Sequence, residues 1–431
     1  MYRKIMDYLK EWKGSEHRKP LILQGARQVG KTYSILEFGR TCYENVAYFN
    51  FETNPKLNET FAENISPDYL IPILSHIAGQ TIIREKTLIV FDEVQLCERA
   101  LTSLKYFCED APEYHIIVAG SLLGVAVNRA RFSFPVGKVD MKTLYPMDME
   151  EFMLAMGEEQ LVELIKKCFQ TDSPMPAALH DAAMQLYRQY LVVGGMPECV
   201  MQFIQTKDYI LVRNTQNTIL ASYLNDMSKY NNLNEIKKTR LAYDNITVQL
   251  SKKNTRFQYK LIKKGGRASE FENAIEWLCL SGIVSQVYKV EQIKKPLENY
   301  RDIDAFKIYV SDLGLLCAKK ELMANDILYM VKELDDFKGG MTENYVNVQL
   351  SINGYHTYYW ESARGAEIDF VIQREGKLIP IEVKSADNTR AKSLKIYMDT
   401  YEPDYAIKLS AKNFAFEDRK KIVPLYAAFC I

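Results

Sequence analysis

A glycine-bounded loop near the start of the chain has the residue types needed to bind phosphate. It follows an apolar run, residues 20–24, precedes a helical pattern, residues 33–38, and fits G-x-x-x-x-G-K-[ST]. The glycines let successive backbone amides face a phosphate at the positive end of a helix. We predict that Lys31 reaches the β- and γ-phosphates of ATP and that the Thr32 hydroxyl binds Mg²⁺. The predicted nucleotide-binding residues are Gly25, Ala26, Arg27, Gln28, Val29, Gly30, Lys31, Thr32 and Tyr33.

A second apolar run, residues 86–91, ends in the acidic pair Asp92 and Glu93. In open α/β sheets ligands bind outside the carboxyl ends of the strands, which is where these two carboxylates would lie. We predict that Asp92 holds Mg²⁺, directly or through water, and that Glu93 polarises the attacking water. The expected cofactors are therefore ATP and Mg²⁺.

A third apolar run, residues 115–120, ends at Ser121. We expect this strand to lie between the other two, so that Ser121 faces the γ-phosphate as a catalytic residue with Lys31 and Glu93; the alternative is a helix N-cap. Arg129 and Arg131 are candidates for placing positive charge near the transition state, in this chain or a neighbouring subunit, and Arg27 is a third. Solvated surface arginines are the alternative.

Composition and the remaining strand patterns define the class of protein. Further strands are predicted at residues 46–51 and 139–144, which gives a five-stranded parallel α/β sheet. The 47% hydrophobic and 26% charged residues are typical of a folded globular chain. No apolar run is long enough to span a membrane, and the first residues do not form a signal-peptide pattern, so we expect a cytoplasmic location. The eight cysteines are scattered, which argues against a zinc site or a disulfide framework.

The middle of the chain is predicted to be helical, with a basic segment. Residues 151–225 have helical periodicity, and residues 228–318 have three helical stretches followed by strands at 283–288 and 306–310, a winged-helix pattern. Residues 226–267 hold eleven Lys or Arg against three acids. Nucleic-acid binding is one interpretation, and a solvated face or docking to a partner protein is the other. The candidate phosphate contacts are Lys252, Lys253, Arg256, Lys260, Lys263, Lys264 and Arg267.

The chain resembles the bacterial and archaeal AAA-type P-loop ATPases whose C-terminal half is a domain of unknown function. The resemblance covers nearly the whole chain and implies an ATPase whose biological role is poorly defined. Residues 145–152 depart from the family pattern, but they lie outside the predicted nucleotide site. The resemblance rests on the loop described above and on residues 91–95 (FDEVQ), 119–121 (AGS), 194–198 (GGMPE), 309–316 (YVSDLGLL) and 382–384 (EVK).

The C-terminal part carries a second set of carboxylates that resembles the PD-(D/E)xK nuclease fold. Glu343 lies where a helix is predicted to open at residue 341, and Asp369 lies on a strand at 366–372. Glu382 and Lys384 share one face of the next strand, 376–384, after a turn at 374–376. In active members of that fold the strand carboxylates hold Mg²⁺ and the lysine positions water. These four residues form the candidate nuclease site, although such domains also persist without cleavage activity.

The sequence thus predicts an α/β protein in four parts. These are an AAA-type core (1–150), a helical lid (151–227), a winged-helix-like module (228–318) and a nuclease-like domain (319–431). One hypothesis is an ATPase that repositions residues 228–431 on nucleic acid. The other is a nucleotide-dependent switch that binds a protein partner and cuts nothing. Homo-oligomerisation is compatible with both, and a small-molecule kinase is a weaker third reading.

Overall fold

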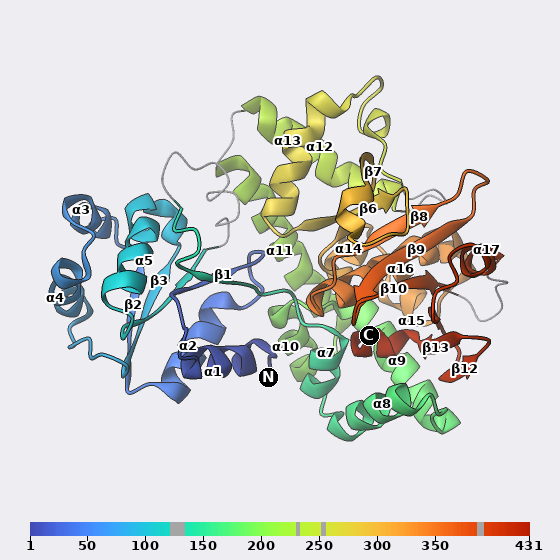
Figure 1. Cartoon of the computed structure of the whole chain (residues 1–431), viewed down its shortest axis with the longest axis horizontal. Helices are drawn as coiled ribbons and strands as arrows, with labels where there is room; N and C mark the ends of the chain where they lie inside the picture. The colour runs from blue at the N-terminus through green and yellow to red at the C-terminus, as the bar shows by residue number, and fades with distance from the viewer. Residues whose placement is uncertain (121–133, 230–232, 251–255, 386–391) are drawn as a thin grey trace. The chain divides into compact units, whose positions relative to one another are not determined.

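The computed structural model describes residues 1–120, 134–229, 233–250, 256–385 and 392–431, which fall into two compact units. Unit 1 comprises residues 1–145 and 280–282, and unit 2 comprises residues 146–279 and 283–431. Figure 1 labels most of the helices and strands of both.

Unit 1 is built on a parallel sheet in which the five predicted strands have the order β2-β3-β4-β1-β5. Every residue of β3 and β4 is buried, as expected for parallel strands covered on both faces. The strand β4 lies between β1 and β3, which confirms the predicted order of these three. The strands are β1 (Leu21–Gln24), β2 (Asn45–Asn50), β3 (Thr87–Asp92), β4 (His115–Ala119) and β5 (Asp140–Thr143).

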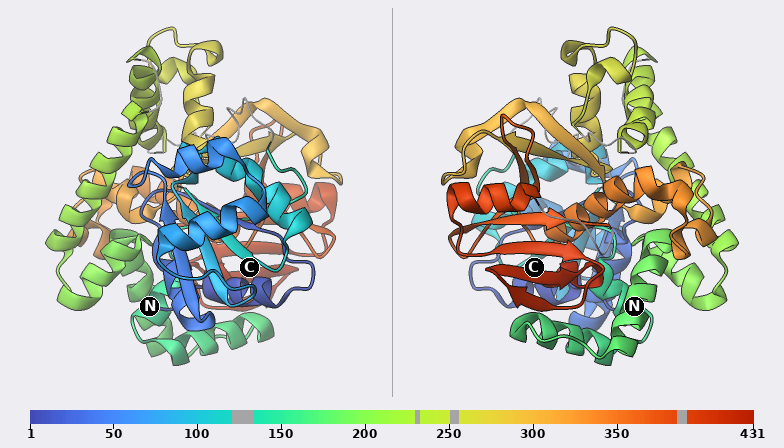
Figure 2. Two further views of the ribbon diagram at one scale, coloured as in Figure 1. Left: turned by 90° about the vertical axis from the view of Figure 1, so that its left-hand side faces the viewer. Right: turned by 90° about the vertical axis from the view of Figure 1, so that its right-hand side faces the viewer.

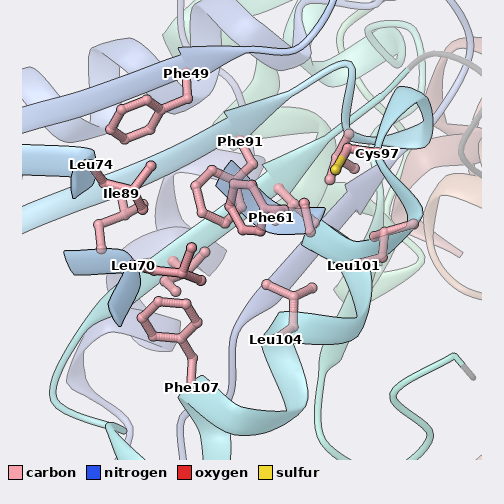
Figure 3. Close-up of a cluster of buried hydrophobic side chains, with 14 of the residues drawn as sticks. Phe49, Phe61, Leu70, Leu74, Ile89, Phe91, Cys97, Leu101, Leu104 and Phe107 are labelled. Carbon is pink, nitrogen blue, oxygen red and sulfur yellow. The ribbon is translucent and has the colours of Figure 1, made fainter. Parts of the chain in front are cut away.

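Helices on both sides of this sheet create the core of unit 1. Figure 3 shows one part of it, in which Phe49, Ile89 and Phe91 of the sheet meet apolar side chains from three helices. Phe61 packs edge-on against Phe91, with ring centroids 5.5 Å apart. The helices among the described residues of this unit are α1 (Ile5–Gly14), α2 (Lys31–Cys42), α3 (Leu57–Glu63), α4 (Pro67–Ala78), the 3-10 turn η1 (Val94–Leu96) and α5 (Glu98–Asp110).

Unit 2 contains a mixed eight-stranded sheet with the order β12-β13-β11-β10-β9-β8-β6-β7. The β6–β7 hairpin joins the C-terminal strands through parallel pairing of β6 with β8. The right-hand view of Figure 2 shows the C-terminal strands, orange to red, side by side. The strands are β6 (Val284–Val290), β7 (Arg301–Val310), β8 (Tyr358–Glu361), β9 (Glu367–Arg374), β10 (Lys377–Val383), β11 (Ala406–Ser410), β12 (Ala415–Glu417) and β13 (Lys420–Pro424).

Helices make up the rest of unit 2, and several agree with the predicted pattern. A break at residues 172–176 separates α8 from α9, and a tight turn at Gly194 separates α9 from α10. The α-helices are α7 (Met149–Ala155), α8 (Glu159–Thr171), α9 (Ala177–Val193), α10 (Pro197–Thr206), α11 (Tyr209–Lys229), α12 (Leu233–Gln249), α13 (Ala268–Leu280), α14 (Leu313–Lys319), α15 (Ala324–Leu328), α16 (Asp335–Ile352) and α17 (Lys392–Tyr401). The 3-10 turns are η2 (Tyr259–Leu261), η3 (Leu297–Tyr300), η4 (Lys332–Leu334) and η5 (Leu425–Cys430).

The helix that carries Glu343 begins earlier than the sequence suggests. We expected it to open at residue 341, but α16 starts at Asp335 and runs through Gly339 and Gly340. Glycine weakens a helix, so the pair looks like a boundary in the sequence. The structure explains Gly340, because a Cβ there would lie 2.0 Å from the carbonyl oxygen of Leu250. Close backbone packing therefore outweighs helix propensity at this position.

The predicted winged-helix module differs in detail from what the structure contains. Between residues 228 and 318 the described residues form α12, the turn η2, α13, the β6–β7 hairpin with η3 in its connection, and most of α14. The hairpin is thus preceded by two α-helices and a 3-10 turn rather than by three helices. The hairpin itself is present, but its strands belong to the same sheet as the strands predicted for a separate nuclease-like domain. The winged-helix assignment and the four-part division stay predictions.

Candidate functional site

The phosphate-binding loop lies between the end of β1 and the start of α2. Gly25 has φ +145°, and a Cβ there would lie 2.1 Å from the carbonyl oxygen of Leu144, so no larger residue fits. Gly30 also has a positive φ, 93°, directly before the first turn of α2. The loop thus delivers its backbone amides to the positive end of a twelve-residue helix, which is the arrangement that binds anionic groups.

The side chain of Lys31 is held across the loop by backbone carbonyl groups at the start of the loop. Its ammonium group donates to the carbonyl oxygens of Gly25 and Ala26, each at 2.8 Å, and the residue is only 8% exposed. These bonds fix the charge at the loop, where the sequence predicts the β- and γ-phosphates. The role of Lys31 in binding these phosphates stays a prediction.

Thr32 and Asp92 are brought together by the sheet. The Thr32 hydroxyl donates to Oδ2 of Asp92 at 2.9 Å, although sixty positions separate the two residues. Asp92 ends β3 with 5% exposure, and its Oδ1 accepts the backbone N–H of Glu93 at 3.0 Å. A hydroxyl beside a carboxylate is the oxygen donor set that suits Mg²⁺, so these residues fit the expected ion.

The structure adds Tyr48 and Asn50 to this site, and the sequence analysis assigned neither. The Tyr48 hydroxyl donates to Oδ2 of Asp92 at 2.7 Å, and the Asn50 amide donates to the Tyr48 hydroxyl at 3.3 Å. Burial raises the pKa of Tyr48 to about 12, with a further contribution from Asp92, so the hydroxyl stays protonated and donates. The parallel pairing of β2 with β3 sets Asn50 level with Asp92, so the contact depends on strand pairing rather than on a sequence motif.

Arg3 is a third residue at this site that the sequence did not indicate. It is 6% exposed and donates to the carbonyl oxygen of Val29 in the loop at 3.0 Å. It also donates to the carbonyl oxygen of Tyr145, which follows β5, at 2.8 Å. A single guanidinium group therefore ties the phosphate loop to the chain leaving the sheet edge.

Glu93 has an unusual backbone conformation. Its φ is 52°, in the left-handed region that a residue with a Cβ adopts at a cost of about 1 kcal/mol. Its carboxylate accepts a hydrogen bond from the side-chain amide of Gln95. The predicted catalytic carboxylate is thus positioned by local backbone geometry and by a neighbour in the turn that follows β3.

Part of the predicted catalytic set cannot be placed. β4 ends at Ala119 beside β3, and Ser121, Arg129 and Arg131 lie outside the described residues. Arg27 is half-buried within the loop. The roles of these residues stay predictions.

The predicted C-terminal site residues also lie close together, in unit 2. Asp369 on β9 and Glu382 on β10 are on neighbouring antiparallel strands joined by a tight turn, as predicted. Asp369 Oδ2 accepts the N–H of Val383 at 2.7 Å, and Glu382 forms an ion pair with Lys384. Glu343 of α16 accepts from the Tyr309 hydroxyl at 3.0 Å.

The structure places an unpredicted cation in this cluster. Lys307 of β7 is 1% exposed, and its ammonium nitrogen lies 3.3 Å from Oε2 of Glu343 and pairs with Glu367. Burial opposes its charge, but the surrounding acidic side chains, Glu343 foremost, raise the pKa of Lys307 well above its ordinary value. Burial, reinforced by Glu343 and Glu382, raises the pKa of Asp369 well above its usual range. Sequence patterns gave no sign of Lys307, because a single lysine in a strand is usually exposed.

Three segments of the chain match models of known protein families. Residues 17–153 match the model of an AAA domain. Residues 184–326 and 338–428 match two models described only as domains of unknown function. No curated protein matches this chain.

Solved structures give weak likenesses. The Walker-type ATPase PABY2304 of Pyrococcus abyssi is 13% identical, with a TM-score of 0.44 over 74% of this chain and 95% of that one. The ORC1 protein of Aeropyrum pernix in complex with DNA is 12% identical, with a TM-score of 0.28 over 74% of this chain and 91% of that one. TM-scores below 0.5 carry no weight in assigning a function. Within the described part of the chain, no helix combines the length and apolar character needed to span a bilayer.

Proposed function

We propose that this chain binds ATP with Mg²⁺ at the loop of unit 1 and hydrolyses it. The observation that carries the proposal is the 2.9 Å contact between Thr32 and Asp92, beside Lys31 and at the first turn of α2. Two loops distant in sequence thus supply a cation, a Mg²⁺ donor set and a row of amides in one place. The match of residues 17–153 to an AAA domain supports the same activity.

The side chains have distinct roles in this proposal. Lys31 binds the β- and γ-phosphates, and Thr32 and Asp92 hold Mg²⁺, which neutralises charge on the phosphates when bound. Tyr48 and Asn50 orient the Asp92 carboxylate. Glu93 orients and deprotonates the attacking water, a contribution of about 10²- to 10⁴-fold for a well-placed base.

The test is ATP binding by the full chain, measured by calorimetry with and without Mg²⁺. Lys31→Ala should weaken binding at least tenfold, because it removes the charge that contacts two phosphates. Lys56→Ala changes an exposed lysine that precedes α3 and serves as the matched control. Absence of ATP binding by the wild-type chain, or equal binding by Lys31→Ala, would contradict the proposal.

We further propose that ATP turnover is coupled to nucleic-acid binding by unit 2. Arg256, Lys260, Lys264 and Arg267 are exposed, and so is Lys263, whose ammonium group lies 3.2 Å from Glu270. Lys252 and Lys253 lie outside the described residues. Exposed lysines at this density attract phosphates in a salt-dependent manner. The double variant Lys260→Glu, Lys264→Glu should abolish stimulation of ATP turnover by nucleic acid, whereas Lys56→Glu should not.

A second candidate is a nucleotide-dependent switch that binds a protein partner, with a nuclease-like part that does not cleave. The observation that favours it is Lys307, which lies among the acidic side chains that a nuclease would need for its metal ions. A homo-oligomer is compatible with either candidate. Turnover that is insensitive to DNA and RNA, together with a nuclease-resistant complex with a partner protein, would support the switch.

A further inference from the structure

The acidic cluster of unit 2 has four carboxylates and two ammonium groups from separate elements. Glu343 comes from α16, Glu367 and Asp369 come from β9, and Glu382 comes from β10. Against these acids lie Lys384, paired with Glu382, and Lys307. The cluster is mostly buried, with Lys307 at 1%, Glu382 at 2% and Asp369 at 9% exposure.

Lys307 is directed inward from the strand at the end of the sheet. β6 and β8 separate β7 from β9 in the sheet order, yet the Lys307 ammonium reaches Glu367 of β9 as well as Glu343. It also lies 5.1 Å from the centre of the Tyr359 ring on β8. Two acidic side chains and an aromatic ring therefore surround a single ammonium group that water barely reaches.

The carboxylates that would bind a metal already have partners. Glu343 accepts from Tyr309 and contacts Lys307, one oxygen of Asp369 accepts a backbone N–H, and one oxygen of Glu382 pairs with Lys384. Among the described residues, no group of three His, Cys, Asp or Glu side chains is arranged to hold a metal ion. One site does stay open, because Oε2 of Glu382 is buried and meets no hydrogen-bond partner within the described ranges.

We propose that Lys307 is the resident cation of this cluster and excludes the divalent metal that a nuclease of this type requires. An ammonium group and a divalent ion between the same carboxylates would repel each other strongly at such short range. Lys307 instead neutralises Glu343 and Glu367 and links β7, α16 and β9. The cluster is therefore a metal-independent ionic core, and the open oxygen of Glu382 becomes part of a metal site only when Lys307 is removed.

Binding of Mn²⁺ to the full chain, counted by electron paramagnetic resonance without nucleotide, tests this proposal. All proteins carry Asp92→Asn, which removes the carboxylate predicted to hold the metal ion of unit 1, so that this unit does not contribute a metal site. With Lys307 present, Asp369→Asn should leave Mn²⁺ binding unchanged. Lys307→Met keeps the length of the side chain without its charge. This variant should bind one more Mn²⁺ ion than the parent protein, with an affinity at least about tenfold above any binding of Mn²⁺ to the cluster in the parent. Adding Asp369→Asn or Glu382→Gln to Lys307→Met should remove that ion, and Lys307→Arg should bind none.

Two results would overturn the proposal. One is a Mn²⁺ ion that binds with Lys307 present and is lost in Asp369→Asn. The other is a folded Lys307→Met protein that gains no Mn²⁺ site. If Lys307→Met fails to fold, the comparison of Asp369→Asn with its parent still decides whether the native cluster holds a metal, and thermal unfolding with and without Mn²⁺ gives a second readout.

Discussion

The hydroxyl of Tyr48 donates a 2.7 Å hydrogen bond to Oδ2 of Asp92. The same oxygen accepts from Thr32, so two donors fix the carboxylate at the end of β3. Asn50 in turn donates to Tyr48, and its own oxygen accepts the N–H groups of Glu52 and Thr53. The turn after β2 is thereby linked to the predicted Mg²⁺ ligand.

Tyr48→Phe should weaken the use of Mg²⁺ more than the use of ATP. Loss of a hydrogen bond to a metal ligand commonly reduces metal affinity by about tenfold or more, so the Mg²⁺ concentration for half-maximal turnover should rise about tenfold. The KM for ATP at saturating Mg²⁺ should change little. Tyr114→Phe removes a surface hydroxyl in the same unit, 3.5 Å from Arg84, and provides the control. An unchanged Mg²⁺ dependence in Tyr48→Phe would show that Tyr48 does not position Asp92.

His115 should make unit 1 sensitive to acid. Burial, aided by Arg18 and Lys13, lowers the pKa of His115 to about 4 from an ordinary value of 6.5. The unfolded chain therefore binds more protons between these values, and the stability of unit 1 falls as the pH decreases through this interval. Between about pH 7 and pH 5 we expect a loss of roughly 1–2 kcal/mol from this group.

His115→Phe isolates that contribution. The ring keeps its packing against Trp12, but the hydrogen bond to Tyr43 is lost at every pH, so only the slope with pH is diagnostic. Urea unfolding of the variant should show a smaller difference in free energy between the two pH values. His76→Phe, at an exposed position in α4, should keep the wild-type slope. Equal slopes in His115→Phe and the wild type would refute the assignment.

Asp312 should give unit 2 the opposite pH dependence. Its carboxylate accepts the N–H of Gly195 at 2.6 Å and that of Leu315 at 2.8 Å, joining the turn after α9 to the start of α14. Burial raises the pKa of Asp312 to about 6, from 3.8, despite these hydrogen bonds. The folded chain then binds more protons between these values, so the stability of unit 2 falls as the pH rises through the interval.

Asp312→Asn should remove this slope and lower stability at all pH values. The amide keeps one acceptor oxygen but turns an NH₂ group toward a backbone donor, which costs about 1–3 kcal/mol. Denaturant unfolding of the full chain between about pH 4 and pH 7 measures both effects. A variant as stable as the wild type at neutral pH would contradict the structural role of the carboxylate.

The arrangement of the glycine-bounded loop and Asp92 was predictable because its signals are local. Gly25, Gly30 and Lys31 form a fixed pattern within eight residues, and Asp92 ends a plainly apolar strand. Tyr48 and Arg3 were not predictable in the same way. Their contacts depend on strand pairing and on a long side chain crossing the fold, and neither leaves a pattern in the sequence.

The C-terminal half shows where pattern reasoning stops. The placement of Asp369 and Glu382 on adjacent strands follows from two apolar runs joined by a short turn near residues 374–376, and the structure has this arrangement. Lys307 depends on a tertiary arrangement in which β6 and β7 join the C-terminal sheet, and no periodicity predicts such pairing. The early start of α16 was hidden by Gly340, whose presence reflects close packing against Leu250 rather than a helix end.

The most direct test of the central claim is phosphate release from ATP with Mg²⁺ by the wild-type chain, Lys31→Ala and Glu93→Gln. The account predicts turnover by the wild type and a loss of at least about 100-fold in each variant, with ATP binding retained in Glu93→Gln. Turnover that persists in both variants, or a wild-type chain that neither binds nor hydrolyses ATP, would contradict it.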